Sequence, residues 1–181
     1  QGSLIWGLAS LGLLALLAAA FLLWPRSGEP TDELQTRGAP AQAQVELICI
    51  HQGPTHQAHS ARQTDGSYAC DLDESLGFSV LSPGSEALHL ALFALDEAGS
   101  PLWYTPTPTT AGSLRLDQSL RPKALERTLR LAVNHQPGTY RVWALFSAEP
   151  LTFDRVKELA QTLSAGEDLP SAITAKQLVL S

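Results

Sequence analysis

The stretch 88-LHLALFAL-95, near the middle of the 181-residue chain, carries apolar side chains at odd and even positions alike. Neighbouring side chains of a strand point to opposite faces of the sheet, so a strand with one solvated face alternates apolar and polar residues. Residues 88–95 do not alternate in this way. We therefore predict that they form a central strand with both faces buried.

Short apolar runs on both sides of this stretch are separated by turn residues. The runs are residues 45–50, 68–72, 76–81, 87–95, 102–105, 113–116, 129–133 and 139–146, with a last edge strand at 177–180. Asp65-Gly66 and Ala98-Gly99 are typical of tight turns between strands. Many short strands predict a mainly β fold, namely a β-sandwich that is Ig-like or jelly-roll-like.

One α-helix is expected in the C-terminal region of the domain. Thr152 is a suitable N-cap, and Asp154 lies in the first turn, where a negative charge is favourable. Apolar residues then recur at helical spacing: Phe153, Val156, Leu159, Ala160 and Leu163. We expect this apolar stripe to pack on the sheet.

The N-terminal part of the chain differs from the rest. The twelve basic and eighteen acidic residues all follow Pro25. About 20 apolar residues match the hydrocarbon thickness of a bilayer, so residues 4–24 predict one transmembrane helix. The run is longer than the core of a cleavable signal peptide, which is the competing interpretation. Residues 1–3 are expected to be a truncated start.

The organisation around this predicted span follows from composition. Ser3 with Gly7 and Ala15 with Ala19 are small residues at four-residue spacing, a pattern that allows a homodimer through the transmembrane helix. Residues 25–44 contain several Pro and Gly and predict a flexible linker. Residues 45–181 are then an extracytoplasmic domain, because the segment after the span lacks the basic cluster of a cytoplasmic flank.

Cysteine and histidine residues gather at the end of the first expected strand. Cys49, His51, His56 and His59 are weak candidates for a metal site, but their spacing matches no standard zinc motif, so we expect no metal. Cys49 and Cys70 are the only two cysteines. They form either a disulfide, as in an oxidising compartment, or two buried free thiols.

Signatures of catalysis are missing from the sequence. It contains no phosphate-binding glycine loop, no nucleophile elbow and no zinc-protease helix. We therefore expect no enzymatic activity, no catalytic residues and no cofactor.

Two regions are candidates for contact with a partner, most simply a protein. Trp103 and Tyr104 lie beside a Pro-rich stretch at 105–110 and are expected to form an aromatic rim, or else to be buried in the sandwich. Five basic residues lie close together, in a contact patch or in a solvated loop: Arg115, Arg121, Lys123, Arg127 and Arg130. Nucleic acid is not expected as a partner, since the chain has a net charge of −6 and the cluster lacks interleaved aromatic residues.

Three segments carry a resemblance to a known family: 90-LALFALDEAG-99, 103-WYTP-106 and 134-NHQPGTYRVWALFS-147. Together they resemble the extracytoplasmic all-β domain of unknown function found in bacterial single-span membrane proteins, some of which are similar to anti-sigma factors. The resemblance implies a bacterial inner-membrane protein with its C-terminal domain in the periplasm, and a sensory or binding role, such as the outer part of an anti-sigma-type regulator. The alternatives are an accessory structural subunit of a cell-envelope complex and a metal-dependent enzyme built on the Cys and His cluster.

Overall fold

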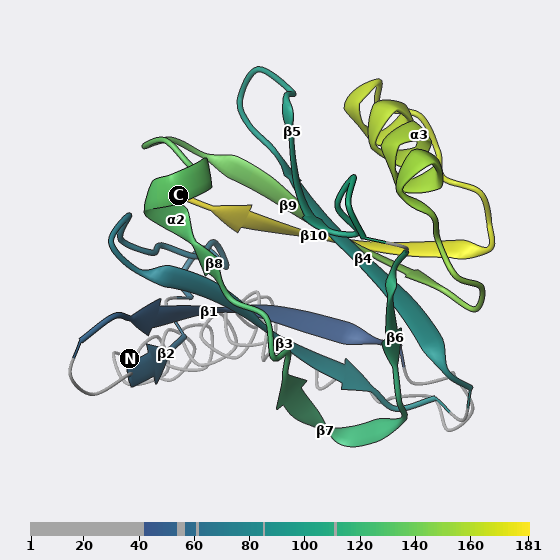
Figure 1. Ribbon diagram of the computed structural model, residues 1–181, viewed down its shortest axis with the longest axis horizontal. Coiled ribbons are helices and arrows are strands. Elements are labelled where there is room, and N and C mark those ends of the chain that lie inside the picture. Colours follow the sequence, from purple (N-terminus) through teal and green to yellow (C-terminus); the bar gives the residue numbers. More distant parts are fainter. Residues whose placement is uncertain (1–41, 54–56, 61, 85, 111) are drawn as a thin grey trace, which may run out of the picture. The chain divides into compact units, whose positions relative to one another are not determined.

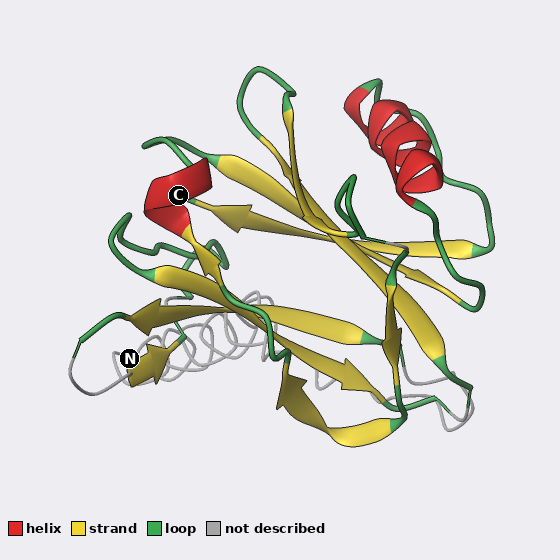
Figure 2. Ribbon diagram, in the orientation of Figure 1, coloured by secondary structure: helices red, strands yellow, loops and turns green. Residues whose placement is uncertain are grey.

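The computed structural model describes residues 42–53, 57–60, 62–84, 86–110 and 112–181. These residues form a mainly β structure with two antiparallel sheets, arranged like a β-sandwich (Figures 1 and 2). The expected mainly β, sandwich-like fold is therefore confirmed for this part of the chain.

The first sheet has the strand order β2-β1-β3-β7, and the short strand β8 also pairs with β3. Its strands are β1 (Gln44–His51), β2 (Gln57–His59), β3 (Ser75–Ser82), β7 (Ser119–Ala124) and β8 (Leu129–Arg130). The long pairing joins β1 to β3, with Leu47 opposite Phe78. On the other side of β3, Val80 lies opposite Lys123 and Ser82 opposite Ser119, with a register shift between the two pairs.

The second sheet has the strand order β10-β9-β4-β5, and β6 pairs with the first half of β4. Its strands are β4 (Leu88–Leu95), β5 (Pro101–Thr105), β6 (Leu114–Leu116), β9 (Tyr140–Ser147) and β10 (Ile173–Leu180). Thus β5 and β6 follow one another along the same side of β4. The turn into β5 contains Gly99 at φ +81°, which glycine adopts without the steric penalty of a Cβ.

Strand β4 is central and buried on both faces, as its sequence predicts. Leu90, Leu92 and Ala94 face the first sheet and belong to the core between the sheets. The side chains between them, including Phe93, belong to a second core on the outer face. Both alternating sets are apolar because each packs against another layer of the molecule.

The layer on that outer face is helix α3 (Phe153–Ser164). Its buried residues Val156, Leu159 and Ala160 pack against the second sheet, on the side away from the first (Figure 1). The Thr152 side chain accepts a hydrogen bond from the Arg155 backbone N–H, so the predicted N-cap is confirmed. The predicted helix and its packing on the sheet are both present.

One segment joins the two sheets along the edge formed by β1 and β10. Tyr68 pairs with β10: its N–H donates to Val179 O, and its carbonyl accepts from Ser181 N–H. Two residues later, Cys70 forms a disulfide with Cys49 of β1. Of the two alternatives for the cysteines, the structure contains the disulfide, and this edge is held by covalent and backbone bonds together.

A second local tie lies before β9, where Tyr140 bonds back to the preceding turn. Its hydroxyl donates to the carbonyl of Gln136 and accepts from the Gln136 N–H. The Tyr140 ring is buried between the sheets. The turn and the core are therefore linked through one side chain.

Several expected strands differ from those observed. Residues 68–72 form no strand, because Tyr68 makes only isolated bridges, one to Arg62 and one to Leu180. The run 129–133 divides into β8 and a short helix α2 (Leu131–Asn134), which adds a helix to the one expected. Strands β2 and β7 were not expected, since their residues are mostly exposed and polar and carry no apolar period.

The predicted transmembrane helix at 4–24, its dimer motif and nearly all of the predicted linker at 25–44 lie outside the described residues. Among the described residues, no helix has both the length and the apolar character needed to cross a membrane.

Removal of the disulfide is expected to destabilise the domain. The bridge closes a loop with a sequence separation of 21 residues, and without it the unfolded chain gains conformational entropy. The double variant Cys49→Ala/Cys70→Ala should lose about 3 kcal/mol of unfolding free energy, measured by urea titration. A reductant should lower the stability of the wild type to the same value and leave the variant unchanged; equal stability of all forms would contradict the prediction.

Candidate functional site

A pocket of about 680 Å³ lies between the two sheets at the edge opposite the joined one. Strands β3 and β7 and the segment 125–129 form one wall, and β4, β5 and β6 form the other. The chain crosses from β6 in the second sheet to β7 in the first at one end of this pocket. The pocket is thus a space between the layers that strand pairing does not close.

The interior of the pocket is apolar. Alternate residues of β3 point inward, so Phe78 and Val80 face the opposing sheet, where Leu92 and Leu116 meet them. Leu125 and Leu129 are half-buried at the outer side of the same space. Such walls can contact the apolar part of a ligand.

One buried polar group also lines the pocket. Ser82, the last residue of β3, is 2% exposed, and its hydroxyl has no hydrogen-bond partner among the described residues. A buried hydroxyl without a partner costs free energy. A ligand with a polar atom at this point would supply the missing bond.

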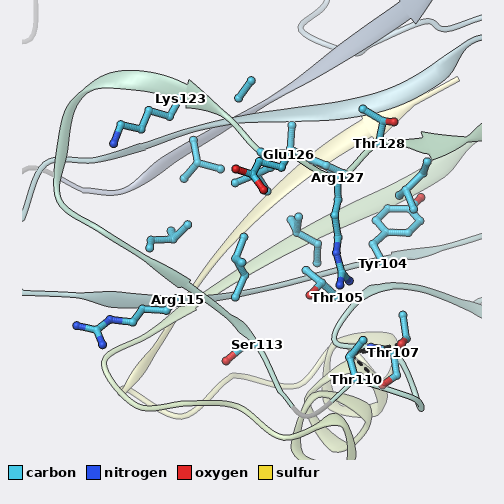
Figure 3. A pocket seen from close by; sticks show the side chains of 18 of the residues that line it. Tyr104, Thr105, Thr107, Thr110, Ser113, Arg115, Lys123, Glu126, Arg127 and Thr128 are labelled. Carbon is cyan, nitrogen blue, oxygen red and sulfur yellow. Dashed lines mark hydrogen bonds between the residues drawn. The ribbon is translucent and has the colours of Figure 1, made fainter. Parts of the chain in front are cut away.

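Cationic side chains surround the mouth of the pocket, as Figure 3 shows. Arg127 extends from the 125–129 segment across the opening toward Thr105 of β5, whereas Lys123 and Arg115 point outward at the other end. Asp117 and Glu126 belong to the same lining. Within the described part of the chain, no carboxylate lies within 4.0 Å of Arg115, Lys123 or Arg127 in an ion pair.

Of the seven residues predicted to contact a partner, five line this pocket: Trp103, Tyr104, Arg115, Lys123 and Arg127. Arg121 and Arg130 are exposed and lie outside the lining. The structure therefore joins most of the two candidate regions, which the sequence treats as separate, into one site.

The aromatic pair does not form the exposed rim that is one of its two interpretations. Trp103 is half-buried, and its ring contacts Phe93 of β4 and Phe153 of α3. Tyr104 points to the other side of β5 and is 6% exposed. Successive residues of a strand face opposite sides, so the Trp103 ring packs toward the helix and the Tyr104 ring packs between the sheets, although atoms of both residues belong to the pocket lining.

The predicted metal candidates are not assembled into a set of four ligands. The Cys49 sulfur is bonded to Cys70, which removes its thiolate, and His56 lies outside the described residues. His51 is exposed, and His59 Nε2 lies 3.8 Å from a carboxylate oxygen of Glu74. Glu74 also lies close to both sulfurs, but a disulfide does not offer thiolate ligands.

A buried polar pair lies behind the pocket. The Tyr104 hydroxyl and His135 Nε2 are 2.7 Å apart and form a hydrogen bond. Burial raises the pKa of Tyr104 well above its ordinary value of 10, and burial lowers the pKa of His135 below 6.5. Both side chains are therefore neutral at pH 7, and the pair fixes the ring that forms part of the pocket wall.

The sequence analysis missed several lining residues, above all Phe78, Val80 and Ser82 of β3. Their alternation predicts that they share the inward face of a strand. It does not predict that the space in front of them stays open. That depends on where β7 pairs with β3 and where the chain crosses from β6 to β7. Thr105, Thr107 and Thr110 also line the pocket, and they lie in the Pro-rich stretch beside the predicted aromatic contact region.

The stability of the domain should fall in mild acid because of His135. The folded chain keeps this ring neutral, whereas the unfolded chain protonates it below its ordinary pKa of 6.5. The unfolding free energy is therefore at its full value above pH 6.5 and declines as the pH falls below that value toward the lowered pKa of the folded state. His135→Gln should flatten this decline in urea titrations between about pH 8 and about pH 5.

The matched control is His51→Gln, which removes an exposed histidine far from the pocket. It should leave the pH profile of the wild type intact. If both variants keep the acid-dependent loss, His135 is not its source.

The pocket thus combines an apolar interior, a buried hydroxyl that has no partner among the described residues, and a cationic mouth. This arrangement can hold a ligand whose apolar part lies in the interior and whose polar part lies at the mouth. No protein-family model, curated protein or solved structure matches the chain.

Proposed function

We propose that the chain is a membrane-anchored extracytoplasmic binding module and that the pocket between its sheets is the binding site. The observation that carries this proposal is the gathering of Tyr104, Arg115, Lys123 and Arg127 around one pocket of about 680 Å³. Pockets of small-molecule sites measure roughly 300–1,000 Å³ and have mostly apolar walls with a few polar groups. In a sensory protein, such a ligand would act by favouring one state of the chain over another.

Two features support the proposed location. Residues 4–24 have the length and composition of a membrane span, so they would anchor the chain in the bacterial inner membrane. The Cys49–Cys70 disulfide is of the kind that persists in oxidising compartments such as the periplasm. The domain would then meet ligands outside the cytoplasm.

An immunoglobulin-like arrangement of the strands is part of the proposal. The order β1-β3-β7 in one sheet and β10-β9-β4-β5 in the other agrees with the A-B-E and G-F-C-C′ strands of such sandwiches. Tyr140, at the start of β9, bonds to the backbone of Gln136, which agrees with their tyrosine corner before strand F. Both features favour this topology over a jelly roll.

Blocking the pocket tests the binding function. Thr105 of β5 lines the pocket and lies at the opening, opposite the inward-facing Leu92, so Thr105→Trp should fill the mouth. After extraction of the full chain from membranes in a detergent-free polymer, native mass spectrometry should find a molecule bound to the wild type and lost from the variant.

Ala148→Trp is the control, because it adds the same side chain at an exposed position outside the pocket. It should retain the bound molecule. A bound population that is the same in the wild type and in both variants, or absent from all three, would count against a ligand-binding pocket.

The redox state of the cysteines in cells tests the proposed location. In cells quenched with acid, Cys49 and Cys70 should react with a mass-tagged maleimide only after reduction, because both are oxidised in the periplasm. Protease added to spheroplasts should also digest the domain. Free thiols in quenched cells, or full protection from the protease, would place the domain inside the cytoplasm.

A further inference from the structure

We propose that the pocket binds a single-chain amphipathic anion, with its apolar chain between the sheets and its carboxylate or phosphate group at Arg127. This inference rests on the proposed function and names the chemical class of its ligand. It follows from the apolar walls and the charges of the site.

The walls select the apolar part of the ligand. Leu114 of one sheet is 39% exposed, and Leu125 and Leu129 on the other side of the pocket are half-buried, so these lining side chains offer apolar surface to a ligand. Phe78, Val80, Leu92 and Leu116 lie deeper and are already almost fully buried. A ligand in this space would touch apolar atoms from both layers. Each CH₂ group that it buries there contributes about 0.8 kcal/mol of hydrophobic transfer free energy, so an alkyl chain suits the interior.

The charges at the mouth select an anion for the other end. Three cations and two carboxylates line the pocket, a local charge of +1 on a chain whose net charge is −6. None of the three cations forms an ion pair with a described carboxylate. An anionic group at the mouth would therefore gain charge-assisted hydrogen bonds without first breaking an existing pair.

Arg127 is the cation best placed to hold that group. In Figure 3 its side chain lies across the opening, whereas those of Arg115 and Lys123 lead away from it. A guanidinium group binds carboxylate and phosphate through two parallel hydrogen bonds. Thr105, toward which Arg127 extends, adds a neutral hydroxyl beside the same position.

Ser82 gives independent support for a ligand in this space. Its hydroxyl is nine-tenths or more buried, belongs to the pocket lining and has no partner among the described residues. The domain itself gains nothing from this group at that position, since an apolar residue would avoid the cost of burying it. The proposed anion carries its polar group at Arg127, so the Ser82 hydroxyl supports an occupant of the pocket but does not identify the class of that occupant.

Four ten-carbon probes test the inference on the full chain in nanodiscs of neutral lipid: decanoate, decyl phosphate, decanol and decyltrimethylammonium. Titration calorimetry, with empty nanodiscs subtracted, should show that both anions bind the wild type about tenfold more tightly than decanol, the effect of one charge-assisted hydrogen bond. The cationic probe should bind more weakly than decanol. The stronger of the two anions identifies the source as a free fatty acid or as a phosphate-bearing lipid.

Arg127→Gln should weaken decanoate and decyl phosphate by about tenfold and leave decanol unchanged. The control Arg141→Gln changes the net charge equally at an exposed site outside the pocket and should have no effect. Arg127→Lys, which keeps the charge, should restore part of the affinity. Partition of the probes into the bilayer is the same for every variant, so it cannot produce these differences.

Failure of this inference is distinguishable from failure of the proposed function. If decanol binds as tightly as the anions, or if Arg127→Gln acts no more strongly than Arg141→Gln, the anion assignment is wrong. The same holds if none of the probes binds. In each case the loss of a bound molecule from Thr105→Trp, but not from Ala148→Trp, would still support a pocket that binds another class of ligand.

Discussion

The bonds along the β1–β10 edge are the constraint on which the rest of the domain depends. A segment of three residues connects both sheets, since Tyr68 pairs with the backbone of β10 and Cys70 is covalently bonded to β1. Because backbone hydrogen bonds and a disulfide hold the two sheets together at this edge, the opposite edge can remain without such bonds. There the chain crosses between sheets from β6 to β7, and a pocket remains between the layers. The position of the candidate site is thus a consequence of where the sandwich is held together.

The pocket lies beside the strand that both cores of the domain share. Strand β4 is buried on both faces, between the core of the sandwich and the core under α3. The charged residues at the mouth, by contrast, are exposed, as are residues 126–128 between β7 and β8. Binding residues on edges and loops that a packed scaffold positions are a common arrangement, because such segments vary without loss of the fold. Arg127 is of this kind, whereas Leu92 belongs to the scaffold itself.

Two buried polar groups near the pocket differ in a way that bears on function. The Tyr104 hydroxyl is bonded to His135, so the domain compensates the burial of this ring by its own means. The Ser82 hydroxyl has no such compensation in the described structure. The Tyr104 hydroxyl is therefore satisfied within the domain. The Ser82 hydroxyl would be satisfied by a bound molecule. The sequence does not show which of the two hydroxyls is hydrogen-bonded within the domain, because both belong to polar residues on strands.

The sequence by itself determined those features that depend on local periodicity and on single residues. The doubled apolar pattern of 88–95 predicted a central strand, and the spacing after Thr152 predicted a helix that packs on a sheet; both are present. Five of the seven residues chosen for partner contact line the pocket, since charge and aromatic clusters are visible in the chain. Only the tertiary structure decided that these clusters meet, that Trp103 packs toward the helix while Tyr104 packs between the sheets, and that Ser82 lines the same pocket. The physical reason is that pairing between distant strands sets these contacts, and a sequence pattern reports which face a side chain takes but not what stands opposite that face.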